Sequence, residues 1–340
     1  MKNFKFFIGI DVSKPYVDVA VVDEKGFSLY SRVENNPESL LQFINGLKKT
    51  PGIKISNSLF GLENTGYYGN HLLKALHTLK ASVVNENPVL IKNSLGLIRG
   101  KDDKLDANRI AEYLCLFQKK LTIWSPKRPI LNELSQLLSL RERLSAISLK
   151  LKVPLKEEKE FITKALSHQN TVLCAKSIDA IKDDISVIEK RIKLVWSSDE
   201  QLKHQMSIIM SIPCIGELTA LNIILSTNEF KNISSPKKFA CYAGVAPFKR
   251  QSGISIIGTS RISHIANKKT KSLLHTCAVL SVRFVPEIKA YFLRKTVNEK
   301  KHKMLVYNAI RSKLILRVFS LIKENRLYQA DYIYGSMEKS

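Results

Sequence analysis

The first 90 residues alternate between short apolar segments and helical segments, and this order limits the possible folds more than any other feature of the chain. The segment YVDVAVVD places Val17, Val19 and Val21 on one face, with Tyr16, Asp18 and Ala20 on the other. The sequence predicts strands at 4–12, 16–23, 27–33, 57–64 and 81–87, and helices at 36–49 and 66–79. Three strands followed by alternating helix and strand predict a layered α/β domain.

Residues 126–200 have a helical pattern instead. Two apolar series follow a spacing of three and four residues, which is typical of a coiled-coil seam: Leu137, Leu140, Leu144, Ile147 and Leu151, then Ile178, Ile181, Ile185, Ile188, Ile192 and Val195. Pro154 lies between the two series and should break or kink the first helix. An antiparallel arm within one chain, two halves of a dimer seam, and ordinary amphipathic helices packed on a core all fit this pattern.

The last part of the chain begins near residue 201. The segment SIPCIGELTALNIILS, residues 211–226, predicts a turn followed by a helix, as in a helix-hairpin-helix, and a basic helical tail follows. We therefore expect an α/β domain at 1–125, a long helical coiled-coil arm or linker at 126–200, and a mostly α domain at 201–340.

The charge of the chain predicts a polyanionic partner. Lys and Arg number 54 against 30 Asp and Glu, a formal net charge of +24. Residues 236–340 hold 21 of these basic residues and 5 of the acidic ones. Such an excess is typical of nucleic-acid binding.

The five cysteines form no C-x-x-C pair, which argues against zinc and favours a reduced, cytoplasmic protein. We expect no membrane partner, because no apolar run approaches about 20 residues.

Acidic residues gather where this basic chain would not be expected to place them. Asp102, Asp103 and Asp106 fall within five positions, and Asp103 and Asp106 would share one face of a helix. Asp11 and Glu63 lie at the ends of two predicted strands, where α/β sheets collect their active sites. Such carboxylates suit Mg²⁺, or Mn²⁺, and two such ions serve phosphodiester chemistry. Turn and cap residues are the alternative explanation, above all for Asp102.

Three of these segments resemble the signatures of a known family. IGIDVSK, LENTGYY and KDDKLDA are similar to the signatures of the DEDD transposases, which include the Piv-type DNA invertases. The resemblance implies an N-terminal RNase H-like fold like that of the resolvase RuvC, with Asp11, Glu63, Asp103 and Asp106 as catalytic metal ligands. Asp102 stands where the family pattern has threonine.

The resemblance continues into the last part of the chain. SIPCIGELTA is similar to a family segment in which glycine occupies the position of Cys214, so a left-handed turn there is in doubt. FACYAGVAPFKRQSG resembles the segment that carries the family's catalytic serine, here Ser252. Basic residues near it are assigned to nucleic-acid binding: Lys249, Arg250, Arg261, Lys268, Lys269 and Lys271. The lone histidines His71, His204, His264 and His275 show no ligand pattern.

The resemblance implies an insertion-sequence transposase, bacterial or archaeal and associated with the nucleoid, that cuts and rejoins DNA through a phosphoserine intermediate. It further implies a homo-oligomer, dimer or tetramer, and a structured noncoding RNA that guides target choice. Three alternatives stay open. A RuvC-like nuclease or Holliday-junction resolvase would use the same acids with water as nucleophile. An actin-like sugar kinase would want Gly and Thr after Asp11, where Ser13, Lys14 and Pro15 stand. The third is a nucleic-acid scaffold without activity.

Overall fold

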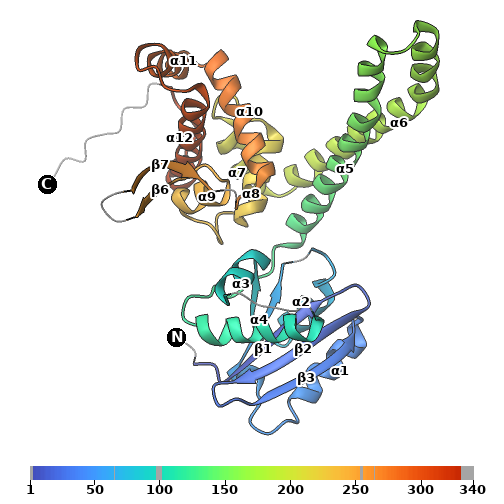
Figure 1. Ribbon diagram of the computed structural model, residues 1–340, viewed down its shortest axis with the longest axis vertical. Coiled ribbons are helices and arrows are strands. Elements are labelled where there is room, and N and C mark those ends of the chain that lie inside the picture. The colour runs from blue at the N-terminus through green and yellow to red at the C-terminus, as the bar shows by residue number, and fades with distance from the viewer. Residues whose placement is uncertain (1–2, 65, 97–101, 253–255, 264, 331–340) are drawn as a thin grey trace, which may run out of the picture. The chain divides into compact units, whose positions relative to one another are not determined.

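The computed structural model describes residues 3–64, 66–96, 102–252, 256–263 and 265–330, apart from the side chains of residues 249–252, 256, 257, 259 and 260. Lys101 and the side chains of Lys249, Arg250 and Ser252 therefore lie outside the described part. The chain forms two compact units, residues 1–126 and 127–340 (Figure 1). The separate arm domain at 126–200 stays a prediction.

The N-terminal unit is built on a five-stranded mixed sheet with the strand order β3-β2-β1-β4-β5. β1 and β4 are parallel, as are β4 and β5, whereas β1–β2 and β2–β3 are antiparallel. All five strands occur where the sequence predicts them: β1 Phe6–Val12, β2 Tyr16–Asp23, β3 Ser28–Glu34, β4 Ser58–Glu63 and β5 Ser82–Glu86.

Helices cover both faces of this sheet. α1 (Pro37–Leu47) and α2 (Asn70–Thr78) pack on one face, where Leu40, Ile44 and Leu76 join the strand valines in one core. α4 (Asp103–Phe117) packs on the other face, beside the short α3 (Pro88–Ser94). β2 is consequently buried on both sides, and Asp18 is buried with it.

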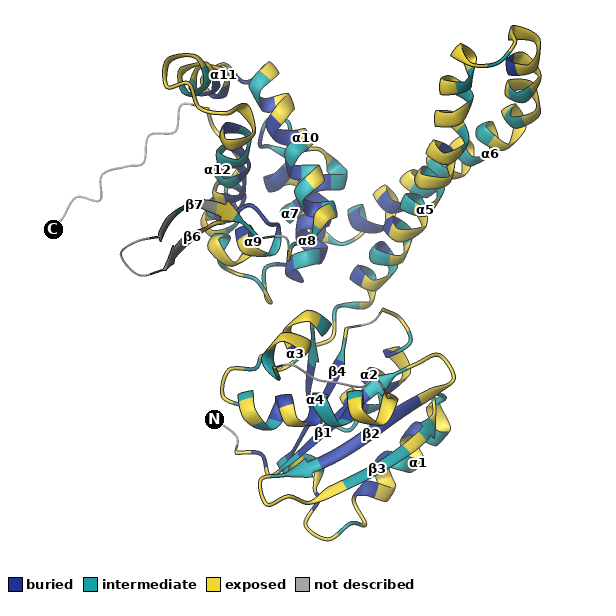
Figure 2. Ribbon diagram, in the orientation of Figure 1, coloured by how far each residue is buried: buried dark blue, intermediate teal, exposed yellow. Residues whose placement is uncertain are grey.

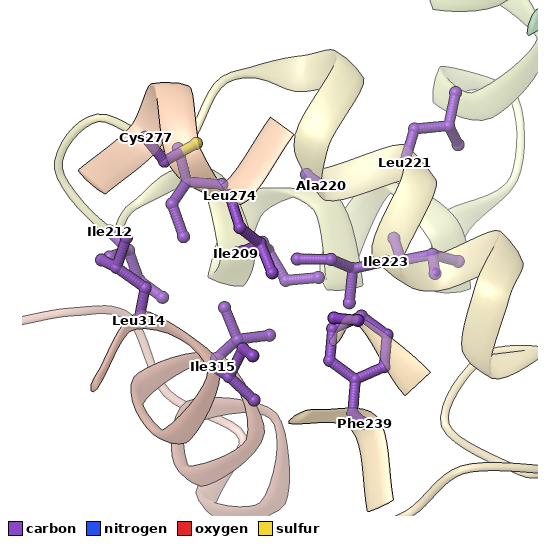
Figure 3. Close-up of a cluster of buried hydrophobic side chains, with 14 of the residues drawn as sticks. Ile209, Ile212, Ala220, Leu221, Ile223, Phe239, Leu274, Cys277, Leu314 and Ile315 are labelled. Carbon is purple, nitrogen blue, oxygen red and sulfur yellow. The ribbon is translucent and has the colours of Figure 1, made fainter. Parts of the chain in front are cut away.

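The C-terminal unit is mostly helical, as the sequence predicts. Its helices are α5 Pro129–Glu157, α6 Lys164–Ser197, α7 Glu200–Met210, α8 Glu217–Thr227, α9 Pro236–Tyr242, α10 Lys268–Phe284, α11 Pro286–Leu293 and α12 Lys303–Glu324. Figure 3 shows its core, where Ile209, Ile223, Phe239, Leu274 and Ile315 meet from five different helices. A hairpin of β6 (Pro247–Ser252) and β7 (Ile256–Ile262) is the described sheet of this unit.

α5 and α6 form an antiparallel pair within the one chain. The ion pairs Arg141–Glu189 and Arg191–Glu133, each at 2.7 Å, link the two helices. On α6 the predicted apolar series is half-buried, and its last two members, Ile192 and Val195, are buried. On α5, Leu140 and Ile147 of the predicted series are 37% and 46% exposed. Leu131, Leu134 and Leu138 are the buried leucines of α5. They join the helical core at the base of the pair, and Figure 2 shows how exposure increases away from it.

The structure decides two points about the helical unit that the sequence left uncertain. α5 continues through Pro154 and ends three residues later, at Glu157, so this proline marks the last turn rather than a break between helices. Cys214 adopts φ +69°, so the left-handed turn between α7 and α8 forms without glycine. In the described part of the chain, no helix is long and apolar enough to cross a membrane.

Candidate active site

Close packing of α4 against β1 brings the predicted acids to one edge of the sheet. A β-carbon on Gly9 would lie 2.2 Å from the carbonyl oxygen of Ala107 and 2.3 Å from the amide nitrogen of Ala111. Glycine therefore lets the backbone of α4 touch the backbone of β1. Asp11 follows Gly9 by two residues, and the first turn of α4 holds Asp103 and Asp106. One strand and one helix thus present acids at the same edge.

Glu63 reaches this edge through the parallel pairing of β1 and β4. Ile10 is the Cα partner of Leu62, so Asp11 and Glu63 come next in the same register. Glu63 is the last residue of β4. The N-terminal end of α4 carries a partial positive charge, which favours acidic side chains in its first turn. Asp102 occupies the N-cap position of α4, and its side chain accepts no capping hydrogen bond.

The acids perturb one another. Burial raises the pKa of Asp11, and the charges of Asp106 and Asp103 raise it further. Burial also raises the pKa of Glu63, with Asp11 and Asp106 adding to the effect. Each shift means that the ionised carboxylate is disfavoured where it stands. The four predicted acids therefore share one electrostatic field, which a cation would neutralise.

Two arginines already neutralise part of this charge. Nη2 of Arg32 lies 2.9 Å from Oδ2 of Asp103, and Nη1 of Arg109 lies 2.6 Å from Oδ1 of Asp106. Arg32 also donates through Nε to Oδ1 of the buried Asp18, at 2.9 Å. Tyr30 donates its hydroxyl to the same Asp18 oxygen, which raises the pKa of Tyr30. Arg32 thus bridges Asp18 to Asp103.

The chemistry of this donor set fits a divalent metal ion. Carboxylate oxygens are the ligands that Mg²⁺ prefers, and both burial and the neighbouring carboxylates raise the pKa values of Asp11 and Glu63. Among the described residues, no group of three or more His, Cys, Asp or Glu side chains is arranged so that it could hold a metal ion. Arg32 and Arg109 each contact one oxygen of Asp103 and Asp106, so the second oxygen of each carboxylate is the one available to a metal ion.

The second predicted catalytic element lies in the other unit. Ser252 is the last residue of β6, and its Cα partner on β7 is Ile256. Arg261, on β7, pairs with Phe248 and is exposed. Lys268, Lys269 and Lys271 lie together in the first turn of α10. The ammonium of Lys269 is ion-paired with Glu142 of α5.

Sequence reasoning missed Asp18, Arg32 and Arg109. The alternation of β2 placed Asp18 on a polar face, and no sequence signal shows that α4 covers this face. Arg32 lies on β3 opposite Asp18, in register across the antiparallel pair, so the strand pairing itself could have suggested that ion pair. Arg109 follows Asp106 by three residues on α4, which is the spacing of a helical ion pair.

Comparisons with known proteins identify the family of the chain. A family model described as "Transposase", with the name DEDD_Tnp_IS110, matches residues 8–157, which include the four acids. A second, described as the transposase IS116/IS110/IS902 family, matches residues 206–293, which include Ser252.

Individual relatives support the same family. The chain is 28% identical over 328 residues to the pilin gene-inverting protein of Moraxella bovis, covering 95% of this chain and 97% of that protein. It is 27% identical over the same length to the pilin gene-inverting protein of Moraxella lacunata. An insertion element IS110 protein of Streptomyces coelicolor is 22% identical over 157 residues, 46% of this chain and 37% of that protein. This chain belongs to the IS110 family of transposases, and it is an enzyme that recombines DNA.

Proposed function

We propose that this transposase cuts and rejoins DNA strands by transesterification, with Ser252 as the nucleophile and a divalent cation at Asp11, Glu63, Asp103 and Asp106. The relatives in Moraxella are named for inverting a pilin gene. By analogy, this chain rearranges a DNA segment that carries its own recognition ends. The observation that carries the proposal is the common electrostatic field of four acids from β1, β4 and α4. The sheet order β3-β2-β1-β4-β5 supports the RNase H-like class that the resemblance implies.

The proposed reaction keeps the number of phosphodiester bonds constant. The Ser252 oxygen forms a bond to phosphorus, the bond from phosphorus to the sugar oxygen breaks, and the serine proton ends on that sugar oxygen. A second transfer to a new sugar hydroxyl reverses these steps and releases Ser252. The covalent link preserves the bond for rejoining. Magnesium, when bound, would polarise the phosphoryl oxygens and stabilise the leaving oxygen.

Other parts of the proposal follow from the resemblance. They are a homo-oligomeric complex that holds two DNA partners, and a structured noncoding RNA whose pairing selects the sequence. The contribution of this chain's own residues is then mainly contact with backbone phosphates. The +16 surplus of residues 236–340, from 21 basic and 5 acidic residues, suits that role.

Substitution of the helix acids tests the metal site. Asp103→Asn or Asp106→Asn should abolish strand cleavage, because each removes a charged oxygen ligand. DNA binding, measured by fluorescence anisotropy, should be retained. Asp102→Thr is the matched control, since it lies next to the site and its side chain makes no cap bond to α4. Loss of cleavage in Asp102→Thr together with normal cleavage in Asp103→Asn would contradict the assignment of ligands.

A further inference from the structure

A buried arginine lies on α12 without an acidic partner. Arg311 is 3% exposed, and its Nε has no hydrogen-bond partner. None of the ion pairs found among the described residues includes it. Buried charges are normally paired, because an uncompensated one is costly. A guanidinium held in this way is suited to an anion that approaches from outside the chain.

Two further basic side chains face Arg311 from α10. Nη2 of Arg311 lies 3.3 Å from Nδ1 of His275. A guanidinium can only donate, so Nδ1 of His275 accepts and the ring proton lies on Nε2. The imidazole of His275 packs edge-to-face with the ring of Tyr307, which restrains its orientation. The ring centroids are 5.4 Å apart and the interplanar angle is 88°. Lys271 precedes His275 by four residues and so shares its helix face.

The electrostatics of the three groups all point the same way. Burial lowers the pKa of Lys271, and the charge of Arg311 lowers it further. The same two causes, in the same order, lower the pKa of His275. Burial lowers the pKa of Arg311 itself. Positive charge is thus disfavoured at all three groups, and an anion between them would remove that penalty.

The end of α10 adds positive potential. Its first turn holds Lys268 and Lys271 besides Lys269, whose charge is paired with Glu142, and it holds no acidic residue. The N-terminus of a helix is itself partly positive. Asn308, one turn before Arg311 on α12, donates through Nδ2 to the carbonyl oxygen of Val245 at 2.8 Å, while its own Oδ1 is buried without a partner. This contact places the cluster against the segment that leads into β6.

We propose that Lys271, His275 and Arg311, the Arg311 cluster, form a binding site for a phosphate group of a nucleic-acid backbone at the base of the β6–β7 hairpin. An Arg fork, a lysine point charge and an imidazole N–H are suitable donors for phosphate oxygens. The identity of the strand rests on the proposed function, whereas the phosphate chemistry does not.

The position of the Arg311 cluster indicates whether it would bind the phosphate that Ser252 attacks or a neighbouring phosphate of the strand. A Cβ on Gly244, three residues before β6, would come within 3.7 Å of Cδ of Lys271. The six residues of β6 then extend about 17 Å to Ser252. This length corresponds to about five base-pair steps of duplex DNA at 3.4 Å per step. Because Ser252 lies at the far end of β6, the phosphate assigned to the Arg311 cluster would be a flanking one that sets the position of the strand, and not the phosphate that Ser252 attacks.

The first experiment uses inorganic phosphate as the probe. The ring resonances of the seven histidines are observed in the full chain with isotope-labelled histidine, and that of His275 is assigned from His275→Gln. At constant ionic strength, phosphate should shift the His275 resonance saturably. The shift should disappear in Arg311→Met and weaken in Lys271→Met. Because Lys271 is only half-buried, its replacement disturbs the packing of the fold less than the replacement of Arg311. Arg283→Met, an exposed change on the same helix, should keep it.

The proposal would be overturned if phosphate did not shift the His275 resonance of the wild-type protein. It would also be overturned if the phosphate-induced shift in both Arg311→Met and Lys271→Met were as large as in the wild type. Unchanged resonances of the other histidines show that a variant is folded.

The second experiment identifies the source of the phosphate. The affinity for a duplex oligonucleotide is measured against salt, with no cleavage required. Loss of one phosphate contact should reduce the slope of log K against log salt by about 0.9 in Arg311→Met. A phosphate-induced shift of His275 with an unchanged slope would overturn the nucleic-acid assignment and identify free phosphate as the ligand. If strand exchange through Ser252 were disproved, both readouts would still decide the proposal.

Discussion

Replacement of Gly9 by alanine tests whether close packing of α4 on β1 places the acids. The new Cβ would lie 2.2 Å from the carbonyl oxygen of Ala107, where ordinary contact needs 3.4 Å or more. Because the obstacle is backbone, α4 must move by roughly 1 Å. Overpacking of this kind costs about 1–3 kcal/mol, so we expect a loss of that size in the free energy of unfolding of the N-terminal unit. Strand cleavage should fall as well, because Asp103 and Asp106 move with α4.

Urea unfolding followed by the fluorescence of Trp124 measures this loss. The other tryptophan, Trp196, lies in the C-terminal unit and is replaced by phenylalanine in all the proteins compared. Gly46→Ala is the matched control, since a Cβ at this exposed position of α1 meets nothing within 4 Å. It should stabilise the same unit by about 0.5–1 kcal/mol. Equal stability and cleavage in Gly9→Ala and the parent protein would refute the packing argument.

Two arginines give further predictions. Arg32→Met should tighten Mn²⁺ binding, measured by calorimetry, because Arg32 competes with the metal for Asp103; weaker binding would show that Arg32 instead holds Asp103 in a ligating position. Arg128→Met should lower the free energy of unfolding by about 3 kcal/mol, measured with urea, because the buried Glu229 loses one of its two ion pairs and keeps only the pair with Lys231. Hydrogen bonds from Arg128 lower the pKa of Asp199. The Asp199 carboxylate therefore stabilises the fold at pH values above its unfolded pKa of about 3.9. This stabilisation is lost as the pH falls through the lower pKa of the folded state. In Arg128→Met this acid-dependent loss should shrink, and an unchanged pH profile would contradict the assignment.

Sequence reasoning found the sheet and the positions of the four acids because their signals are local. Alternating valines indicate β2, and an acid after an apolar strand indicates the end of β1 or β4. It did not find that Asp18 is buried, because β2 is covered on both faces only when α4 packs on the sheet. The ion pair from Arg32 that satisfies Asp18 is likewise a property of the assembled layers.

The helical unit shows the same limit. An apolar series on α5 predicts which residues can form a seam. Which face of α5 becomes buried depends on how it packs against α6 and the helical core. Leu134 and Leu138 are buried, whereas Leu140 and Ile147 are exposed. Arg311 occurs within an apolar helix and has no sequence signal of its own. Its burial follows from the packing of α10 against α12.

The core of the helical unit also determines how the proposed DNA contacts of residues 236–340 can be tested. Leu274 and Leu314, on α10 and α12, pack in the same core as Ile209 and Ile223 (Figure 3). Removal of residues 236–340 would therefore take away half of a shared core. Single substitutions on the folded chain are the appropriate test.

The most direct test of the account is to trap the covalent intermediate. A nicked duplex carrying an element end lets the first transfer occur but prevents rejoining, so the wild-type enzyme should accumulate a denaturant-resistant protein–DNA adduct. Peptide mapping should place that adduct on Ser252. Ser252→Ala should give neither adduct nor cleavage, whereas Ser255→Ala and Ser260→Ala should behave as wild type. Asp11→Asn should give no adduct, because attack also needs the acidic site. A Ser252→Ala protein that still cuts DNA and releases free ends would contradict the serine mechanism and establish water as the nucleophile.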